Sequence, residues 1–160
     1  MAVDMFLKIE GIKGEAQDDK HKDEIDVLSW SWGMSQSGTS HMGGGGGSGK
    51  VAVQDLSITK HMDKATPNLM LYCCGGKHIP KVLLTVRKAG EKALEYMKIT
   101  MEDCLVSHVS TGGSGSEDRL TESLSLNFAK VKVEYTPQKA DGSGEAAIQM
   151  GWDIAKNIKL

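Results

Sequence analysis

The stretch RLTESLSLNFAKVKVEYT, residues 119–136, constrains the fold more than any other part of the chain. Its apolar residues alternate with polar ones, which is the pattern of a strand with one buried face. The alternation changes phase halfway, because Leu124 and Phe128 occupy even positions whereas Val131 and Tyr135 occupy odd ones. A strand that exchanges its buried face bends from one sheet into another. The stretch therefore predicts a closed or nearly closed barrel.

Alternation with period two recurs along most of the remaining chain, which predicts further strands. These predicted strands cover residues 5–11, 25–35, 51–62, 79–88, 94–109 and 148–158. The pattern slips by one residue near Gln54 and Asp55, where we expect a bulge or a strand break. A chain of 160 residues is long enough for one core. We therefore expect a single domain, residues 1–160, of the mainly β class: a compact β-barrel of two sheets with one short flanking α-helix.

The helix is predicted in DKATPNLMLYCCGGKH, residues 63–78. Thr66 followed by Pro67 is typical of an N-cap and a first-turn proline, and Gly75 with Gly76 predicts the end of the helix.

One predicted strand, residues 25–35, divides into a large apolar face and a small polar face. We expect its apolar side chains to pack on the core, namely Leu28, Trp30, Trp32 and Met34. We expect Ser29, Ser31 and Gly33 to lie on the opposite face. From alternation alone, this small polar face is as consistent with an ordinary solvent-exposed sheet face as with a surface that has a special role.

Composition and charge exclude several classes of protein. The net charge of −2 gives no electrostatic reason to expect nucleic acid or an anionic membrane as a partner. The N-terminus carries Asp4 and Lys8 within its apolar run and so lacks the features of a secretory signal. Apolar runs are too short to span a bilayer. We expect a chain made in the cytoplasm, with its three cysteines reduced.

The glycine run MGGGGGSGKV, residues 42–51, matches the spacing of a phosphate-binding loop between Gly44 and Lys50. Such a loop needs a hydroxyl residue after the lysine and a helix behind it. Here Val51 follows Lys50, and the next residues alternate like a strand. We interpret the run as a loop and predict no nucleotide cofactor.

The sequence lacks the residue spacings that are typical of metal sites and of catalytic sites. Cys73 and Cys74 are adjacent, no paired CxxC or HxxxH occurs, and no GxSxG elbow surrounds a serine. We therefore predict no metal, no cofactor and no enzyme activity.

Several stretches together resemble the Hcp family, the haemolysin-coregulated proteins of type VI secretion systems. They occur in order from the N-terminus to about Ile154 and include EIDVLSWSWGMSQSG, HMGGGGGSGKV, DKATPNLML, GKHIPK and VSTGGSGSEDRLTESLSLNFAKVKVEYTPQKADG. The resemblance implies a fold related to phage tail-tube proteins. It implies hexameric rings that stack into the inner tube of the injection machine, with spike and sheath components as partners. It also implies secretion through that apparatus and small effector proteins held in the ring lumen.

The resemblance gives roles to two groups of residues. We expect Ser29, Ser31 and Gly33 to line the channel and to bind effectors. Contacts within or between rings are expected at His41, Gly44, Gly45, Gly46, Gly47, Lys50, Glu117, Asp118 and Arg119. Cys73 or Cys74 is a candidate for crosslinking between rings after secretion. The alternative is a phage-type tail-tube subunit or a cytosolic effector-binding module that is not secreted.

Overall fold

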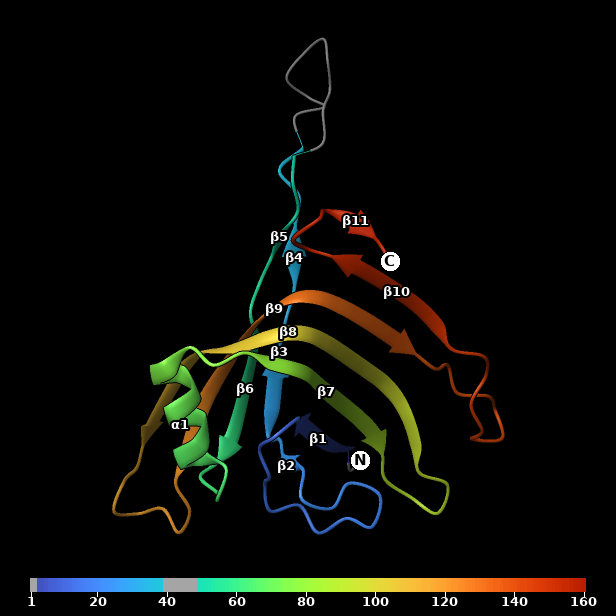
Figure 1. The fold of residues 1–160 in the computed structure, drawn as a ribbon. Helices are drawn as coiled ribbons and strands as arrows, with labels where there is room; N and C mark the ends of the chain where they lie inside the picture. The colour runs from blue at the N-terminus through green and yellow to red at the C-terminus, as the bar shows by residue number, and fades with distance from the viewer. Residues whose placement is uncertain (1–2, 39–48) are drawn as a thin grey trace.

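The computed structural model describes residues 3–38 and 49–160, so His41 and Gly44 to Gly47 lie outside the described residues. The described chain is mainly β with one helix, as predicted (Figure 1). Its elements in chain order are β1 (Val3–Ile9), β2 (Ile25–Asp26), β3 (Ser29–Ser31), β4 (Met34–Ser35), β5 (Ala52–Val53), β6 (Leu56–His61), α1 (Thr66–Gly75), β7 (Ile79–Lys88), β8 (Leu94–Gly112), β9 (Thr121–Tyr135), β10 (Ile148–Asp153) and β11 (Ile158–Lys159).

β8 and β9 form a long antiparallel hairpin in the middle of the larger sheet. β7, β1 and β2 continue that sheet on the β8 side. On the other side, β9 pairs with β6 through its first half and with β10 through its second half. β4 and β5 form a separate two-stranded sheet that projects from the body (Figure 1). The prediction of two sheets is therefore confirmed.

The change of buried face in β9 is also confirmed. Leu124, Leu126 and Phe128 are buried in the first half, and Val131 is buried in the second. The exchange falls between the segment paired with β6 and the segment paired with β10. One continuous strand thus serves two differently oriented parts of the sheet.

The larger sheet is not a closed barrel, although a single chain segment bridges the opening. β2 pairs with β1, whereas β3 pairs with β6. At the corner between β2 and β3, the Val27 N–H donates to the Met5 carbonyl at 3.0 Å and the Leu28 N–H donates to the Thr59 carbonyl at 2.8 Å. The chain therefore changes its hydrogen-bonding partner from one strand to the other, and no strand ladder crosses the gap.

The core lies between the inner faces of these strands. Its fully covered side chains include Leu7, Leu56, Ile58, Val82, Leu84, Ile99, Met101, Leu124 and Leu126. Trp30 and Trp32 pack against it, as predicted. The expectation for Leu28 and Met34 is wrong, since they are 45% and 46% exposed. Leu28 lies outside the strands, at the corner between β2 and β3, and Met34 follows the point where β3 ends at Ser31 and the chain leaves the sheet to form β4.

The helix ends where predicted but begins one residue earlier than predicted. Its N-cap is Ala65 rather than Thr66, and the Ala65 N–H donates to Asp63 Oδ1 at 3.0 Å. The Thr66 hydroxyl instead accepts the Asp63 N–H and reaches Glu122 in the interior. Gly76 adopts a left-handed φ of 61°, which ends the helix where the glycine pair predicted.

The segment after Lys50 forms β5, so a strand and not a helix follows the glycine run. The predicted break near Gln54 and Asp55 is confirmed, because β5 ends at Val53 and β6 begins at Leu56. No helix among the described residues is long and apolar enough to cross a membrane.

Candidate functional site

Two cross-strand rows of small polar side chains cover one face of the sheet formed by β3, β6, β9 and β8. Residues paired in register lie on the same side of a sheet. The first row contains Ser29, Thr59, Ser123 and Ser110. The second row contains Ser31, Ser57, Ser125 and His108. We call these eight residues the hydroxyl face.

The hydroxyl face lies on the opposite side of the sheet from the core. The row between its two rows contains Trp30, Ile58, Leu124 and Val109, which all belong to the core or pack against it. Thr59 and Ser125 are half-buried, and the other residues of the hydroxyl face are exposed. Hydroxyl groups both donate and accept hydrogen bonds without carrying a charge. The face therefore offers many weak polar contacts and no lysine or arginine.

A β-bulge shapes one end of the hydroxyl face. The register of β8 against β9 shifts between Val106 and His108, which leaves Ser107 as the extra residue. The Ser107 hydroxyl donates to Asp55 Oδ2 at 2.6 Å, and Asn127 Nδ2 donates to Asp55 Oδ1 at 2.9 Å. Both carboxylate oxygens are thus engaged, so the bulge holds the acidic side chain of Asp55 at this end of the face.

A polar hollow of about 430 Å³ lies at the other end of the hydroxyl face. Thr59, Ser110 and Ser123 line it together with the start of the connection between β8 and β9. Glu117 also lines it, which places one predicted contact residue beside this face. Asp118 and Arg119 are exposed in the same connection.

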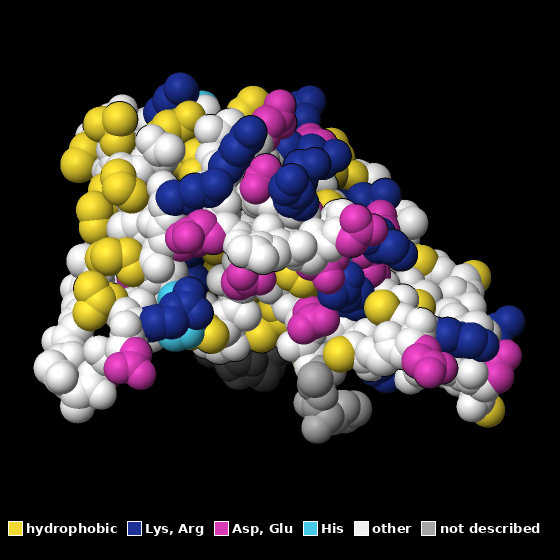
Figure 2. Space-filling view, turned by 90° about the horizontal axis from the view of Figure 1, so that it is seen from below, with side chains coloured by type: hydrophobic (Ala, Val, Ile, Leu, Met, Phe, Trp, Pro, Cys, Tyr) yellow, Lys and Arg dark blue, Asp and Glu magenta, His cyan; other side chains and the backbone are white. Residues whose placement is uncertain are grey.

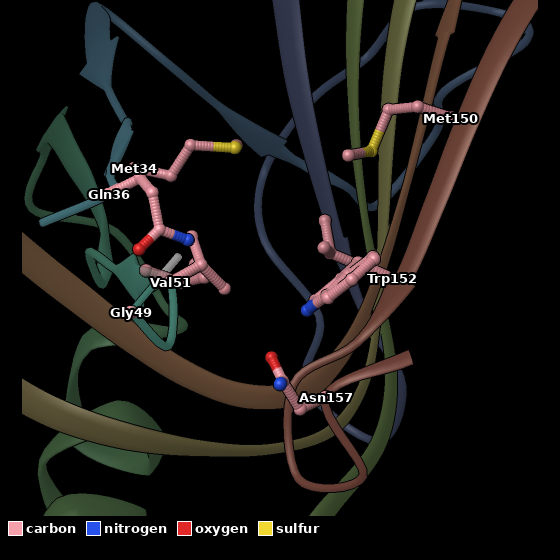
Figure 3. A pocket seen from close by; sticks show the side chains of 9 residues that line it. Met34, Gln36, Gly49, Val51, Met150, Trp152 and Asn157 are labelled. Atoms are coloured by element: carbon pink, nitrogen blue, oxygen red, sulfur yellow. The ribbon is translucent and has the colours of Figure 1, made fainter. Parts of the chain in front are cut away.

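An apolar pocket of about 270 Å³ separates the β4–β5 hairpin from β10. In Figure 3, Met34 and Val51 of the hairpin side face Met150 and Trp152 of the β10 side across the hollow. The indole nitrogen of Trp152 is buried and has no hydrogen-bond partner among the described residues. The hairpin therefore covers the β10 side only in part.

The core-side face of the sheet continues beyond the core along β10. Tyr135 and Ile148 are paired in register, and Met150 follows on the same side. Their exposed fractions are 48%, 66% and 40%, respectively. We call these three residues the apolar edge. Exposed apolar side chains that adjoin one another mark contact surfaces more often than isolated ones do.

The charged side chains are distributed differently from the hydroxyls. Figure 2 shows Lys and Arg intermixed with Asp and Glu over the face at the bottom of Figure 1. Away from the core, Lys81, Glu102 and Lys130 form a cross-strand row of alternating sign on β7, β8 and β9. These surfaces present no large area of one sign.

Three clusters of charged side chains surround a buried residue, namely Lys60, His21 and Arg87, and sequence reasoning missed all three. Arg87 donates hydrogen bonds to Asp18 and Asp4. Lys60 is fully buried, bonds Asp63 Oδ1 at 2.9 Å and contacts Glu122, whose side chain is 1% exposed. A signal existed, because Lys60 and Glu122 occupy positions in the buried phase of their strands. The cluster ties β6 and β9 to the start of α1, which indicates a structural role.

The second buried cluster surrounds His21, in the loop between β1 and β2. Its ring stacks on Phe6 at 4.4 Å between centroids, and its two nitrogens face Glu24 and Glu95. Burial opposes ionisation of Glu95, but hydrogen bonds from His21 and Lys98 hold the pKa of Glu95 below its ordinary value. This cluster fastens the loop to the start of β8.

The predicted channel residues lie as follows. Ser29 and Ser31 are exposed members of the hydroxyl face, and Gly33 is half-buried just beyond β3. Lys50 is exposed before β5. Six further residues of the hydroxyl face were not predicted with them, because their alignment depends on the register between distant strands. Among the described residues, no three His, Cys, Asp or Glu side chains form a group that could hold a metal ion.

Solved structures with this fold define the class of protein. A structure described as a type six secretion system protein matches with a TM-score of 0.93 and 30% identity, over 99% of this chain and 100% of that chain. Hcp1 from Salmonella typhimurium matches with a TM-score of 0.81 and 41% identity over the whole of both chains. By fold, the chain is a type VI secretion protein.

The sequence comparisons identify the family. Residues 6–135 match the family model described as "Type VI secretion system effector, Hcp". The chain is also 62% identical over 161 residues to Protein hcp1 of Pseudomonas aeruginosa, with 99% of each chain covered. The chain belongs to the Hcp family of type VI secretion systems, which confirms the resemblance found in the sequence.

Proposed function

We propose that the chain is the structural subunit of the type VI inner tube and assembles into hexameric rings whose channel is lined by the hydroxyl face. The hydroxyl face itself carries this proposal. It extends over four strands, opposite the core, with small uncharged side chains apart from His108. A wall of this kind lets a protein cargo hydrogen-bond weakly and leave again.

The apolar edge supports assembly into a ring. Tyr135, Ile148 and Met150 are exposed beside a pocket that the β4–β5 hairpin only partly covers. A neighbouring copy would remove this apolar surface from water, which stabilises association by about 25 cal/mol for each Å². Because the hydroxyl face and the apolar edge lie on different parts of the chain, both can be used in one ring.

Stacking of rings needs a second, head-to-tail contact that propagates instead of closing. Lys50 and the connection containing Glu117, Asp118 and Arg119 remain our candidates, as do His41 and Gly44 to Gly47. The tube would be secreted when the apparatus fires, with spike and sheath components as partners and small effectors carried in the lumen. In this role the subunit acts by assembly and binding and not by catalysis.

The test substitutes Ser31→Gln, which adds a bulky polar side chain to the channel wall without touching the core. Rings seen by electron microscopy should persist, while the amount of effector that co-purifies with them should fall. The matched control is Lys81→Gln on the charged outer row. Unchanged co-purification in the Ser31 variant would refute the channel assignment, and a purified protein that stays monomeric at high concentration would refute the ring.

A further inference from the structure

We propose that α1 of one copy docks into the apolar pocket between the β4–β5 hairpin and β10 of the next copy in the ring, with Leu71 entering the pocket. This inference rests on the proposed function, in which the chain forms rings, and it names the two surfaces that meet. Because these surfaces differ, the contact is heterologous and can repeat from copy to copy around a closed ring.

Helix α1 carries no charge although one side of it lies at the surface. Its sequence, TPNLMLYCCG, contains no charged residue. Leu69 is buried and packs in the core, whereas Leu71 is 66% exposed on the outer side, beside exposed Pro67 and Asn68. A surface helix normally presents charged and polar residues to water, and a helix that is apolar on most sides is normally buried. The outer side of α1 is therefore suited to being covered by another protein surface.

The pocket has the chemistry to receive an apolar side chain from this helix. Its volume is about 270 Å³, and Met34 and Val51 face Met150 and Trp152 across it (Figure 3). None of the described residues that line it is charged. Burial of a charge costs free energy unless the charge is paired. A leucine from an uncharged helix fills such a hollow without leaving any charge unpaired.

The unpaired hydrogen-bonding groups of the two surfaces also match. The indole nitrogen of Trp152 is buried without a partner among the described residues, and it points into the hollow (Figure 3). The last carbonyl groups of a helix have no partner within the helix. In α1, the Tyr72 carbonyl accepts from Gly76 and Lys77, so the carbonyls that follow Tyr72 remain for another donor. Docking of this end of α1 would give the Trp152 N–H an acceptor, which removes the cost of leaving it unpaired.

The two surfaces lie beyond opposite borders of the hydroxyl face. The strands of that face run in the order β3, β6, β9 and β8, so β3 and β8 are its borders. Helix α1 packs on β8, and Thr66 at its start bonds Glu122, which pairs with Thr111 near the end of β8. The β4–β5 hairpin follows β3, and Figure 1 shows α1 and β10 on opposite sides of the molecule. The proposed contact therefore brings β8 of one copy towards β3 of the next and continues the hydroxyl face around the channel.

Site-directed crosslinking tests the contact directly. The variant carries Leu71→Cys and Met150→Cys together with Cys73→Ser and Cys74→Ser, so that the remaining native thiol, Cys104, is buried. Purified rings are treated with a short bis-maleimide. The two introduced thiols of neighbouring copies should be joined, and denaturing gels should show a ladder that extends to six chains. Either introduced cysteine alone should give no ladder, because the contact joins two different surfaces.

A matched control moves one thiol to the charged outer row. In the same background, Leu71→Cys combined with Lys81→Cys should give no ladder, and electron microscopy verifies the rings of both variants. Rings of the Leu71 and Met150 variant that yield no ladder overturn the inference and leave the proposed function intact. Absence of rings from the unmodified chain overturns the proposed function instead.

Substitutions at the two surfaces give a second measurement that needs no crosslinker. Leu71→Asp places a charge against the pocket and should yield monomers with an unchanged circular dichroism spectrum, whereas Leu71→Met should still form rings. Trp152→Phe keeps an aromatic side chain but lacks the N–H, so the protein concentration at which half of the rings dissociate should rise at least about threefold. Leu71→Asp rings as stable as unmodified rings overturn the docking, and unchanged stability of Trp152→Phe rings refutes the hydrogen bond.

Discussion

His21 Nε2 lies 2.7 Å from Glu95 Oε1 and joins the loop between β1 and β2 to the start of β8. The other ring nitrogen, Nδ1, lies 2.8 Å from Glu24 Oε2. A neutral imidazole donates from one nitrogen only, whereas the doubly protonated ring can donate to both carboxylates. His21 therefore contacts two acidic side chains while its ring stacks on Phe6.

Replacing His21 should loosen this loop. His21→Leu keeps an apolar contact with Phe6 but leaves Glu24 and Glu95 without their buried partner. We expect the free energy of unfolding to fall by about 1–3 kcal/mol, measured by chemical denaturation. Lys20→Leu, an exposed change next to it, is the control. Equal stability of the two variants would contradict a structural role for the cluster.

The buried Lys60 cluster predicts a larger loss. Lys60→Met removes the cation and leaves Asp63 and Glu122 unpaired, which should cost about 3–5 kcal/mol in unfolding free energy. The double variant Lys60→Met, Glu122→Leu removes both buried charges and should regain part of that stability. A double variant as unstable as the sum of the two single variants would show that the two charges do not interact.

The ion pair between Arg87 and Asp18 predicts that the stability of the fold depends on pH in the acid range. Hydrogen bonds from Arg87 lower the pKa of Asp18 to about 2, below its ordinary value of 3.8. Because the folded pKa is depressed, the contribution of the pair to stability is present above about pH 4 and is lost as the pH falls through about 2. The midpoint temperature of thermal unfolding should fall as the pH is lowered across this interval. The fall should be smaller in the Asp18→Asn variant. Identical pH profiles for the two proteins would contradict the assignment.

The three thiols should react differently. Burial raises the pKa of Cys104 to about 12, while Cys74 is exposed and Cys73 is partly buried against the core. The thiolate is the reactive form, so iodoacetamide should modify Cys74 first and Cys104 only after unfolding. Peptide mass spectrometry gives the order. If oxidised rings crosslink, Cys74→Ser should abolish the crosslink on non-reducing gels, and a crosslink that survives this change would exclude Cys74.

The sequence predicted the features that depend on local pattern. The phase change in β9, the break at Gln54 and Asp55, and the glycine end of α1 each need only neighbouring residues. The stretches shared with the family also sufficed to identify it. The N-cap at Ala65 and the exposure of Leu28 depended on tertiary contacts and were predicted wrongly.

The rest of the candidate site depends on pairing between distant strands. Ser31 was expected on a polar face, but its alignment with Ser57, Ser125 and His108 follows from a register that involves β6, β9 and β8. A slip of one residue would turn every side chain of a strand to the other face. Alternation in one strand does not determine that register.

The central claim is that the hydroxyl face lines the channel of a ring, and cryo-electron microscopy of the purified assembly tests it most directly. The account predicts six-fold rings in which Ser31, Ser57 and Ser125 face the channel and Met150 lies between neighbouring subunits. A ring with these serines on its outer surface, or a protein that forms no ring, would contradict it.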